Sequence, residues 1–332
     1  MNEAQTIAVT GASGFVGQRL VERLTEAGHR VVCLLRPSSD AGALIHPQLR
    51  LTRGALTDAA FVDSALAGCD SVIHCAAMVS DWGTVAEIRR ANVEATQTLV
   101  EAAQRVGIKQ FIHISSTDVY GHPGTAKVSE ADPGSLHFSN WYAETKKAAE
   151  QVLLASALNY TILRPATIYG PGSKSLVGEI GKAVQSGFML LVSGGQSNAG
   201  LVYIDNLIDA IELTLHNPKA ARETFNIADA SQVSWAEFVG QIGKGLGARY
   251  RVLNLPYPLA WALGAFLELG YRHIRRLTGW QTQALLSRQA VQILGIDQDF
   301  AIDKARQQLG FTPGIDFDQG MANTLKWLRQ TA

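Results

Sequence analysis

The chain has few cysteines, no net charge and no long apolar run. Its 332 residues include three cysteines, Cys33, Cys69 and Cys75, an odd number without the Cys/His spacing of a metal site. We therefore expect reduced, buried thiols and no metal. Basic and acidic residues number 29 each, and no dense basic stretch occurs apart from 272–276. This balance argues against binding to nucleic acid.

Segments that would direct the chain to a membrane are also scarce. A strand pattern starts within a few residues of Met1, so we expect no signal peptide and a cytoplasmic protein. The apolar part of 256–276 is too short to span a bilayer, which needs roughly 20 apolar residues. Two interpretations remain for this segment. It is either a helix packed inside the protein, or an apolar lid that rests on a membrane surface with its arginines at the headgroups.

Glycine, in contrast, is abundant, and three glycines follow the first apolar run. Residues 5–9 predict a buried strand, and Thr10-Gly-Ala-Ser-Gly-Phe-Val-Gly17 connects it to a helical pattern over 18–27. Glycines at this spacing allow a tight turn, close approach of the backbone to a pyrophosphate and close packing of helix on strand. The helix N-terminus then offers free N–H groups to the phosphates. The expected dinucleotide contacts here are Gly11, Ser13, Gly14, Phe15 and Val16.

A tyrosine and a lysine one helical turn apart supply the chemistry. Tyr142 and Lys146 project from one face of a helical stretch, downstream of a strand that ends in Ser115-Ser116. An ammonium in this position favours the phenolate and lowers the pKa of the phenol from its usual value of about 10. We expect Ser116, Tyr142 and Lys146 to move a proton to or from a carbonyl or carbinol oxygen, with Thr117 as the alternative to Ser116. This device needs a nicotinamide as its hydride partner.

Strand-like runs alternate with helical periodicity through the first half of the chain. The runs are 5–10, 31–35, 50–53, 71–75, 110–115 and 160–164. Alternation of this kind predicts an α/β fold, a Rossmann-type doubly wound parallel sheet covered on both faces. We expect a smaller, mostly helical C-terminal substrate domain as well. The dinucleotide-binding domain is placed at 1–170, with 205–228 returning to it, and the substrate domain at 171–204 and 229–332.

Six motifs in this order resemble the extended short-chain dehydrogenase/reductase family. They are the glycine turn, His74-Cys-Ala-Ala77, Asn92-Val93, Ser115-Ser-Thr-Asp-Val-Tyr-Gly121, Tyr142-x-x-x-Lys146 and Arg164-Pro-Ala-Thr-Ile-Tyr-Gly-Pro-Gly172. Residues 303–313 are similar to the family's C-terminal region. The resemblance implies that Asn92 holds the backbone near Lys146 and that His74 packs and hydrogen-bonds locally. It also implies cofactor contacts from Asn92, Tyr142 and Lys146 and from the backbone of Ala76, Ala77, Pro165, Ala166 and Ile168. We expect a homodimer.

The end of the second strand carries a base rather than an acid. Arg36 stands there, and no acidic residue occurs before Asp40. An arginine suits the 2′-phosphate of NADP(H), whereas NAD(H) would be met by Asp or Glu, so NADP(H) is favoured and NAD(H) is the alternative. The family usually carries Asp at the position of Ala55, for the adenine amine. We expect backbone groups of Leu56 to serve instead, and Asp58 to cap the next helix.

The loop after the fourth strand favours an apolar substrate. Residues 76–83 and 255–270 resemble a subgroup akin to 3β-hydroxysteroid dehydrogenases and 3-oxoalkanoate reductases. Val79, Trp82 and Thr117 are the expected substrate contacts, with the apolar run 188–192 as a further wall. The predicted substrate is a hydrophobic 3-oxo or 3-hydroxy compound, steroid-like or acyl-chain-like.

Three alternatives remain open. One is a nucleotide-sugar epimerase or reductase of the same superfamily; a dehydratase is less favoured because the Asp-Glu pair typical of that group is missing after Ser116. The second is a non-catalytic NADP-binding sensor, and the third is a membrane-surface scaffold that relies on 256–276.

Overall fold

Seven strands, all parallel, form the central sheet. They are β1 (Thr6–Thr10), β2 (Arg30–Leu35), β3 (Leu49–Arg53), β4 (Ser71–His74), β5 (Gln110–Ile114), β6 (Tyr160–Pro165) and β10 (Glu223–Ile227). Their order across the sheet is β10-β6-β5-β4-β1-β2-β3, with parallel pairing throughout. The computed structural model describes residues 4–331 apart from 80–83, 125–126, 135–137, 139, 216, 230 and 279–285. All six predicted strand runs and the Rossmann-type sheet are confirmed.

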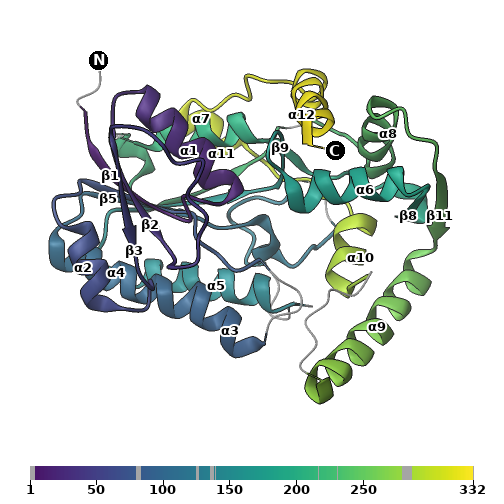
Figure 1. The fold of residues 1–332 in the computed structure, drawn as a ribbon, viewed down its shortest axis with the longest axis horizontal. Coiled ribbons are helices and arrows are strands. Elements are labelled where there is room, and N and C mark those ends of the chain that lie inside the picture. Colours follow the sequence, from purple (N-terminus) through teal and green to yellow (C-terminus); the bar gives the residue numbers. More distant parts are fainter. Residues whose placement is uncertain are drawn as a thin grey trace.

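Helices cover both faces of this sheet (Figure 1). Those of the first half are α1 (Phe15–Glu26), α2 (Ala59–Leu66), α3 (Val85–Arg89), α4 (Ala95–Val106) and α5 (Trp141–Leu154). Those of the second half are α6 (Glu179–Gln185), α7 (Ile204–Thr214), α8 (Trp235–Gly245), α9 (Tyr257–Thr278), α10 (Arg288–Gly295), α11 (Asp303–Leu309) and α12 (Phe317–Thr331). Ile7 and Val9 of β1 belong to the core beneath α1 and α7, whereas Ala8 belongs to the core beneath α2, α4 and α5. This double burial explains the apolar runs of the central strands β1 and β2.

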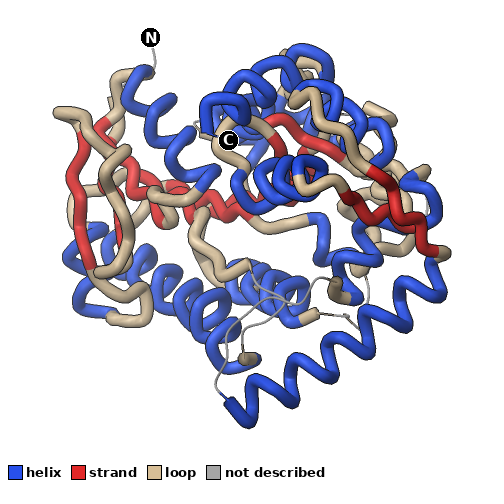
Figure 2. The backbone as a smooth tube through the Cα atoms, turned by 45° about the vertical axis from the view of Figure 1, so that its right-hand side comes forward, coloured by secondary structure: helices blue, strands red, loops and turns tan. Residues whose placement is uncertain are grey.

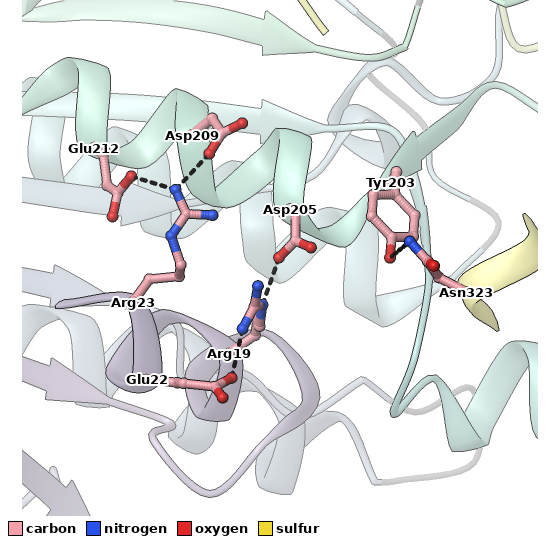
Figure 3. Close-up of polar contacts among 8 residues, drawn as sticks. All are labelled: Arg19, Glu22, Arg23, Tyr203, Asp205, Asp209, Glu212 and Asn323. Carbon is pink, nitrogen blue, oxygen red and sulfur yellow. Dashed lines mark hydrogen bonds and ion pairs between the residues drawn. The ribbon is translucent and has the colours of Figure 1, made fainter. Parts of the chain in front are cut away.

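Ion pairs fasten α7 to α1, across nearly two hundred residues of sequence (Figure 3). Arg19 donates to Asp205, and Arg23 donates to both Asp209 and Glu212. These pairs are half-exposed, so each contributes little to the free energy of unfolding. They nevertheless set the register of α7 against α1, and the next strand, β10, adds to the edge of the sheet beside β6.

The remaining strands form two small parallel pairs outside the main sheet. β7 (Thr167–Tyr169) pairs with β9 (Leu201–Tyr203), and β8 (Phe188–Val192) pairs with β11 (Arg251–Leu255). The interior side chains of β8, Leu191 and Val192, are buried in the core. The expectation that 188–192 forms a wall of the substrate pocket is therefore corrected for these two side chains, which pack inside the protein.

The long helix α9 runs along one edge of the molecule, with α10 beside it (Figures 1 and 2). Ala260 of α9 and Val291 of α10 are buried together with Val192 of β8. Within the described part of the chain, no helix has the length and apolar character needed to cross a bilayer.

Candidate active site

The glycine turn between β1 and α1 is packed too closely to accept side chains at Gly11 and Gly17. Gly11 has a φ of 70°, and a Cβ there would lie 2.7 Å from the backbone N of Ala76. A Cβ on Gly17 would lie 2.1 Å from the carbonyl oxygen of Gly11. Gly14, the N-cap of α1, has no side chain to bind the first N–H groups of the helix. Gly11 and Gly17 thus permit the tight turn and the close packing of α1, and the uncapped N–H groups at the start of α1 fit the pyrophosphate of a dinucleotide.

A chain of buried polar groups joins the ends of β1 and β4. Thr10 Oγ1 lies 2.6 Å from His74 Nδ1 and accepts from the N–H of Ala76. The other ring nitrogen of His74 lies 2.9 Å from Thr96 Oγ1. Burial lowers the pKa of His74 to about 3, so the imidazole is neutral. This histidine has the local role that the sequence predicts, and its contacts hold Ala76 against Gly11.

Ser116, Tyr142 and Lys146 come together at the carboxyl end of β5. The helix α5 begins at Trp141 because the side chain of Asn140 accepts from the N–H of Ala143. Tyr142 is thereby placed in the first turn, where the nearby Ser116 hydroxyl acts to lower the pKa of its phenol. Lys146, one turn later, is buried and donates to the carbonyl oxygen of Ile114, 2.6 Å away.

The electrostatics of this trio differ from the sequence-based expectation. Burial raises the pKa of Tyr142 above its ordinary value, the charge of Asp118 raises it further, and the hydrogen bond with Ser116 opposes both. The amine of Lys146 donates to the β5 backbone, at the carbonyl oxygen of Ile114. Burial lowers the pKa of Lys146 itself to about 8, although Glu150 acts in the opposite direction.

Asn92 connects the loop after β4 to the helix that carries Lys146. It lies in a π-helical turn, Arg90–Glu94, between α3 and α4. Its side chain accepts from the N–H of Met78 and donates to the carbonyl of Met78 and to Thr145 Oγ1. Val79, the next residue, is 73% exposed. Trp82, the other apolar residue predicted in this loop, lies outside the described residues.

The other candidate contacts follow strand ends. Pro165 ends β6, Ala166 donates to the carbonyl of Ile227, and Ile168 lies in β7. Leu56 lies in the loop between β3 and α2, where Asp58 caps α2 as predicted. Thr117 is buried in a 3-10 turn whose first residue is capped by Ser116.

Arg36 follows β2 and is exposed. The guanidinium of Arg53, at the end of β3, donates to the carbonyls of Arg36, Pro37 and Ser39. Sequence reasoning missed Arg53, although a base at the end of the neighbouring strand was a visible signal.

A buried ion pair supports the site from below. Arg164 contacts both carboxylate oxygens of Glu150, at 2.9 and 2.7 Å, and Glu150 also accepts from Ser115. Arg164 donates in addition to the hydroxyl of Tyr120, which donates to Asn226. The two adjacent serines thus differ: Ser115 belongs to this network and Ser116 faces Tyr142.

A second missed contact involves Asp118, whose charge raises the pKa of Tyr142. Gln289 of α10 donates to Asp118 Oδ2 at 3.3 Å, and His122 lies 3.6 Å from Asp118 Oδ1. A cavity of about 660 Å³ beside α1, lined in part by Arg19 and Asp205, includes none of the trio in its lining.

Comparison with known proteins identifies the family. The model of the NAD dependent epimerase/dehydratase family matches residues 7–228. The chain belongs to this family. It is an enzyme, an NAD-dependent oxidoreductase of the epimerase/dehydratase superfamily. The predicted family resemblance is confirmed.

Two relatives cover nearly the whole chain. A 3β-hydroxysteroid dehydrogenase/Δ5→4-isomerase of Mycobacterium tuberculosis is 30% identical over 343 residues, which cover 98% of this chain and 90% of that protein. A 2-alkyl-3-oxoalkanoate reductase of Stenotrophomonas maltophilia is 29% identical and covers 95% and 97%. Among solved structures, MoeE5 in complex with UDP-glucuronic acid and NAD is 26% identical, with a TM-score of 0.78 and coverage of 98% and 100%.

Proposed function

We propose that this enzyme interconverts a hydrophobic 3-oxo compound and its 3-hydroxy form. The observation that carries the proposal is the buried amine of Lys146, which donates to the carbonyl oxygen of Ile114 one helical turn after Tyr142, with the Ser116 hydroxyl near enough to lower the pKa of that tyrosine. When bound, a nicotinamide cofactor supplies or accepts the hydride. Ser116 holds the substrate oxygen, Tyr142 gives or takes the proton, and Lys146 fixes the geometry beneath them.

The names of the relatives support an apolar substrate. Besides the two proteins above, a ketoreductase of Stigmatella aurantiaca that is named for a farnesyl-bearing quinoline oxide is 29% identical over 318 residues. All three names contain a ketone or a hydroxyl on an apolar skeleton. The candidate contacts at Val79, Trp82 and Thr117 stay predictions in this proposal.

MoeE5 favours the competing proposal, a nucleotide-sugar substrate, since it is complexed with UDP-glucuronic acid. Such a substrate needs cations for its pyrophosphate. Arg222 is not free for that role, because it donates to the carbonyls of Ser156 and Leu158 and packs on the ring of Tyr160. Lys182 is paired with Glu179 on the surface. These two cations are therefore already engaged within the protein, which supports the apolar substrate.

The preference for NADP(H) over NAD(H) belongs to the same proposal. Arg36 is exposed directly after β2, and Arg53 holds the turn on which it stands. An exposed guanidinium in this position suits a 2′-phosphate. A homodimer, a cytoplasmic location and the two-domain division remain predictions of the sequence.

Tyr142→Phe tests the proposal. We expect turnover to fall by roughly 10²–10⁴-fold, because the variant lacks the proton donor. The cofactor dissociation constant, from nicotinamide fluorescence, should stay nearly unchanged. Tyr257→Phe, which removes a phenol from α9, is the matched control.

The substrate assay compares a steroid ketone, a 2-alkyl-3-oxo acid and UDP-sugars. Turnover of a UDP-sugar and of neither ketone would establish the competing substrate class. A near-normal rate for Tyr142→Phe would remove the assignment of the proton donor.

A further inference from the structure

We propose that His122 and Asp118 together hold one buried proton, and that this pair sets the charge that acts on Tyr142. The pair lies outside the trio, since His122 follows the 3-10 turn Thr117–Tyr120 and stands four residues after Asp118. His122 Nε2 lies 3.6 Å from Asp118 Oδ1, and the two side chains are 3% and 16% exposed. His122 is then a positioning residue for the proton donor, a role that rests on the function proposed above.

The hydrogen bond on the far side of the imidazole places a proton on Nδ1. His122 Nδ1 lies 3.0 Å from Gln298 Oε1. The orientation of the Gln298 amide is fixed, because its nitrogen donates to the carbonyl of Ile296 at 3.0 Å. An amide oxygen only accepts hydrogen bonds, so Nδ1 of His122 must be the donor. A neutral imidazole has a single ring proton, which leaves none for Nε2.

The Nε2 atom of His122, however, faces a carboxylate. It is buried and has no hydrogen-bond partner among the described residues. Without a second ring proton, its lone pair would face Asp118 Oδ1, and this mostly buried carboxylate would have no cation beside it. A proton on Nε2 turns the contact into an ion pair. An imidazole binds a proton more tightly than a carboxylate, with reference pKa values of about 6.5 and 3.9, so we infer the imidazolium–carboxylate form.

Groups from neighbouring elements act on this pair and on the phenol. Burial raises the pKa of Asp118, while the charge of His122 and a hydrogen bond from Gln289 of α10 lower it. The phenol of Tyr142 on α5 is affected by burial, by the charge of Asp118 and by Ser116. The imidazolium therefore compensates part of the negative charge that the phenol meets, and this compensation is lost when the pair loses its proton.

Ring-nitrogen NMR of the ligand-free enzyme tests the shared proton without any substrate. We expect protons on both ring nitrogens of His122 at neutral pH in the wild type. Asp118→Asn removes the counter-charge, so the ring should keep only the proton on Nδ1. Asp63→Asn, which replaces a half-exposed acid, is the control and should leave both protons in place. A bare Nε2 in the wild type, or both protons in Asp118→Asn, would overturn the proposal.

His122→Asn is the matched variant for the imidazole. The backbone φ at His122 is 56°, a conformation that asparagine adopts more readily than most residues. The amide nitrogen of the asparagine can replace Nδ1 as the donor to Gln298, whereas nothing replaces Nε2. This variant also identifies the ring signals of His122, because they disappear from its spectrum.

The rate of alcohol oxidation tests the effect on Tyr142, because this direction needs the ionised phenol. The probes are a 3-hydroxysteroid and a 2-alkyl-3-hydroxy acid at neutral pH, where the pair holds its proton. His122→Asn leaves the carboxylate uncompensated and should slow oxidation roughly tenfold, as a rise of about one unit in the pKa of the phenol would. This difference should vanish at higher pH, where the wild-type pair also loses its proton. Asp118→Asn removes the charge and should accelerate oxidation.

The double variant Asp118→Asn/His122→Asn separates this role from a purely structural one. It should oxidise the alcohols at the rate of Asp118→Asn, because His122 acts only through the carboxylate. A structural role would slow oxidation and reduction alike. Additive effects in the double variant, or a slowing by His122→Asn that persists at every pH, would overturn the proposal. If Tyr142→Phe keeps its turnover, the proposed function fails, and the NMR experiment still decides whether the proton is shared.

Discussion

Replacing Glu150 with glutamine tests how much the stability of the protein and the pKa of Lys146 depend on the buried carboxylate next to the site. The carboxylate accepts from Ser115 and from two nitrogens of Arg164. Glu150 is 1% exposed and the Arg164 side chain is 9% exposed. The substitution keeps the size of the side chain and one acceptor oxygen, but leaves the guanidinium buried without a counter-charge.

The expected cost follows from this burial. Removing one partner of a buried ion pair costs about 3–5 kcal/mol, mostly because the other charge stays desolvated. The amide oxygen and the hydroxyl of Tyr120 still accept from Arg164, so we expect the lower end, about 3 kcal/mol. This is a large part of the free energy of unfolding of a typical domain, about 5–15 kcal/mol. The variant should also lower the pKa of Lys146 below about 8. In the wild type the charge of Glu150 raises this pKa and so offsets part of the effect of burial, and the glutamine lacks that charge.

Urea denaturation at neutral pH measures the first effect, and NMR titration of the lysine amine measures the second. Asp63→Asn serves as the control, since it breaks the exposed pair with Arg105 and should cost no more than about 1 kcal/mol. A loss for Glu150→Gln as small as that of the control would refute the reasoning. An unchanged pKa of Lys146 would show that the two groups do not interact across the helix turn.

Three further predictions concern single side chains. Lys146→Met should raise stability at pH 7 relative to the wild type by up to roughly 3 kcal/mol, less the lost bond to Ile114. The reason is that burial lowers the pKa of Lys146 from 10.5 to about 8, so between these pH values the unfolded wild type binds more protons than the folded one. In thermal scans the stability gain of the variant should therefore shrink as pH rises from 8 to 10.5. A gain that grows over this range would contradict the reasoning. Arg36→Asp should weaken NADPH at least tenfold and strengthen NADH in fluorescence titrations, while equal dissociation constants in the wild type would contradict the proposed preference. Gly17→Ala should weaken cofactor binding and cost about 1–3 kcal/mol, because its Cβ would collide with backbone; Gly240→Ala, with open space around its Cβ, should do neither, and like effects would contradict the steric reasoning.

The sheet and the trio could be predicted from the sequence because their signals are local. The central strands, such as β1 and β2, are buried on both faces and are mostly apolar, and the glycine spacing after β1 indicates a tight turn into a helix. The pairing of β8 with β11 could not be predicted in this way. The two strands lie some sixty residues apart, and all five side chains of β11 are partly or fully exposed, so β11 has no apolar run. The run 188–192 was therefore interpreted as a pocket wall when its last residues belong to a core.

Some residues of the candidate site could not be predicted from the sequence for a similar reason. Glu150 and Arg164 are polar residues in a helix and at a strand end, where the ordinary expectation is solvent exposure. Only the fold brings them together and buries them. Gln289 likewise reaches Asp118 from an element that sequence reasoning left unassigned. Contacts of this kind depend on tertiary packing and leave no periodic signal along the chain.

These contacts change the account of the proton transfer. The simple sequence argument has Lys146 lower the pKa of Tyr142, whereas burial and Asp118 raise it. The phenol of Tyr142 is then protonated at neutral pH. This protonated form can donate its proton to the oxygen of a ketone while the carbonyl carbon receives the hydride. In the proposed reaction, reduction needs no ionised tyrosine, but oxidation of the alcohol does, so neutral pH favours reduction. Asp118 is in turn contacted by Gln289, so α10 reaches the surroundings of the proton donor through a single hydrogen bond, although burial is the main cause of the raised pKa.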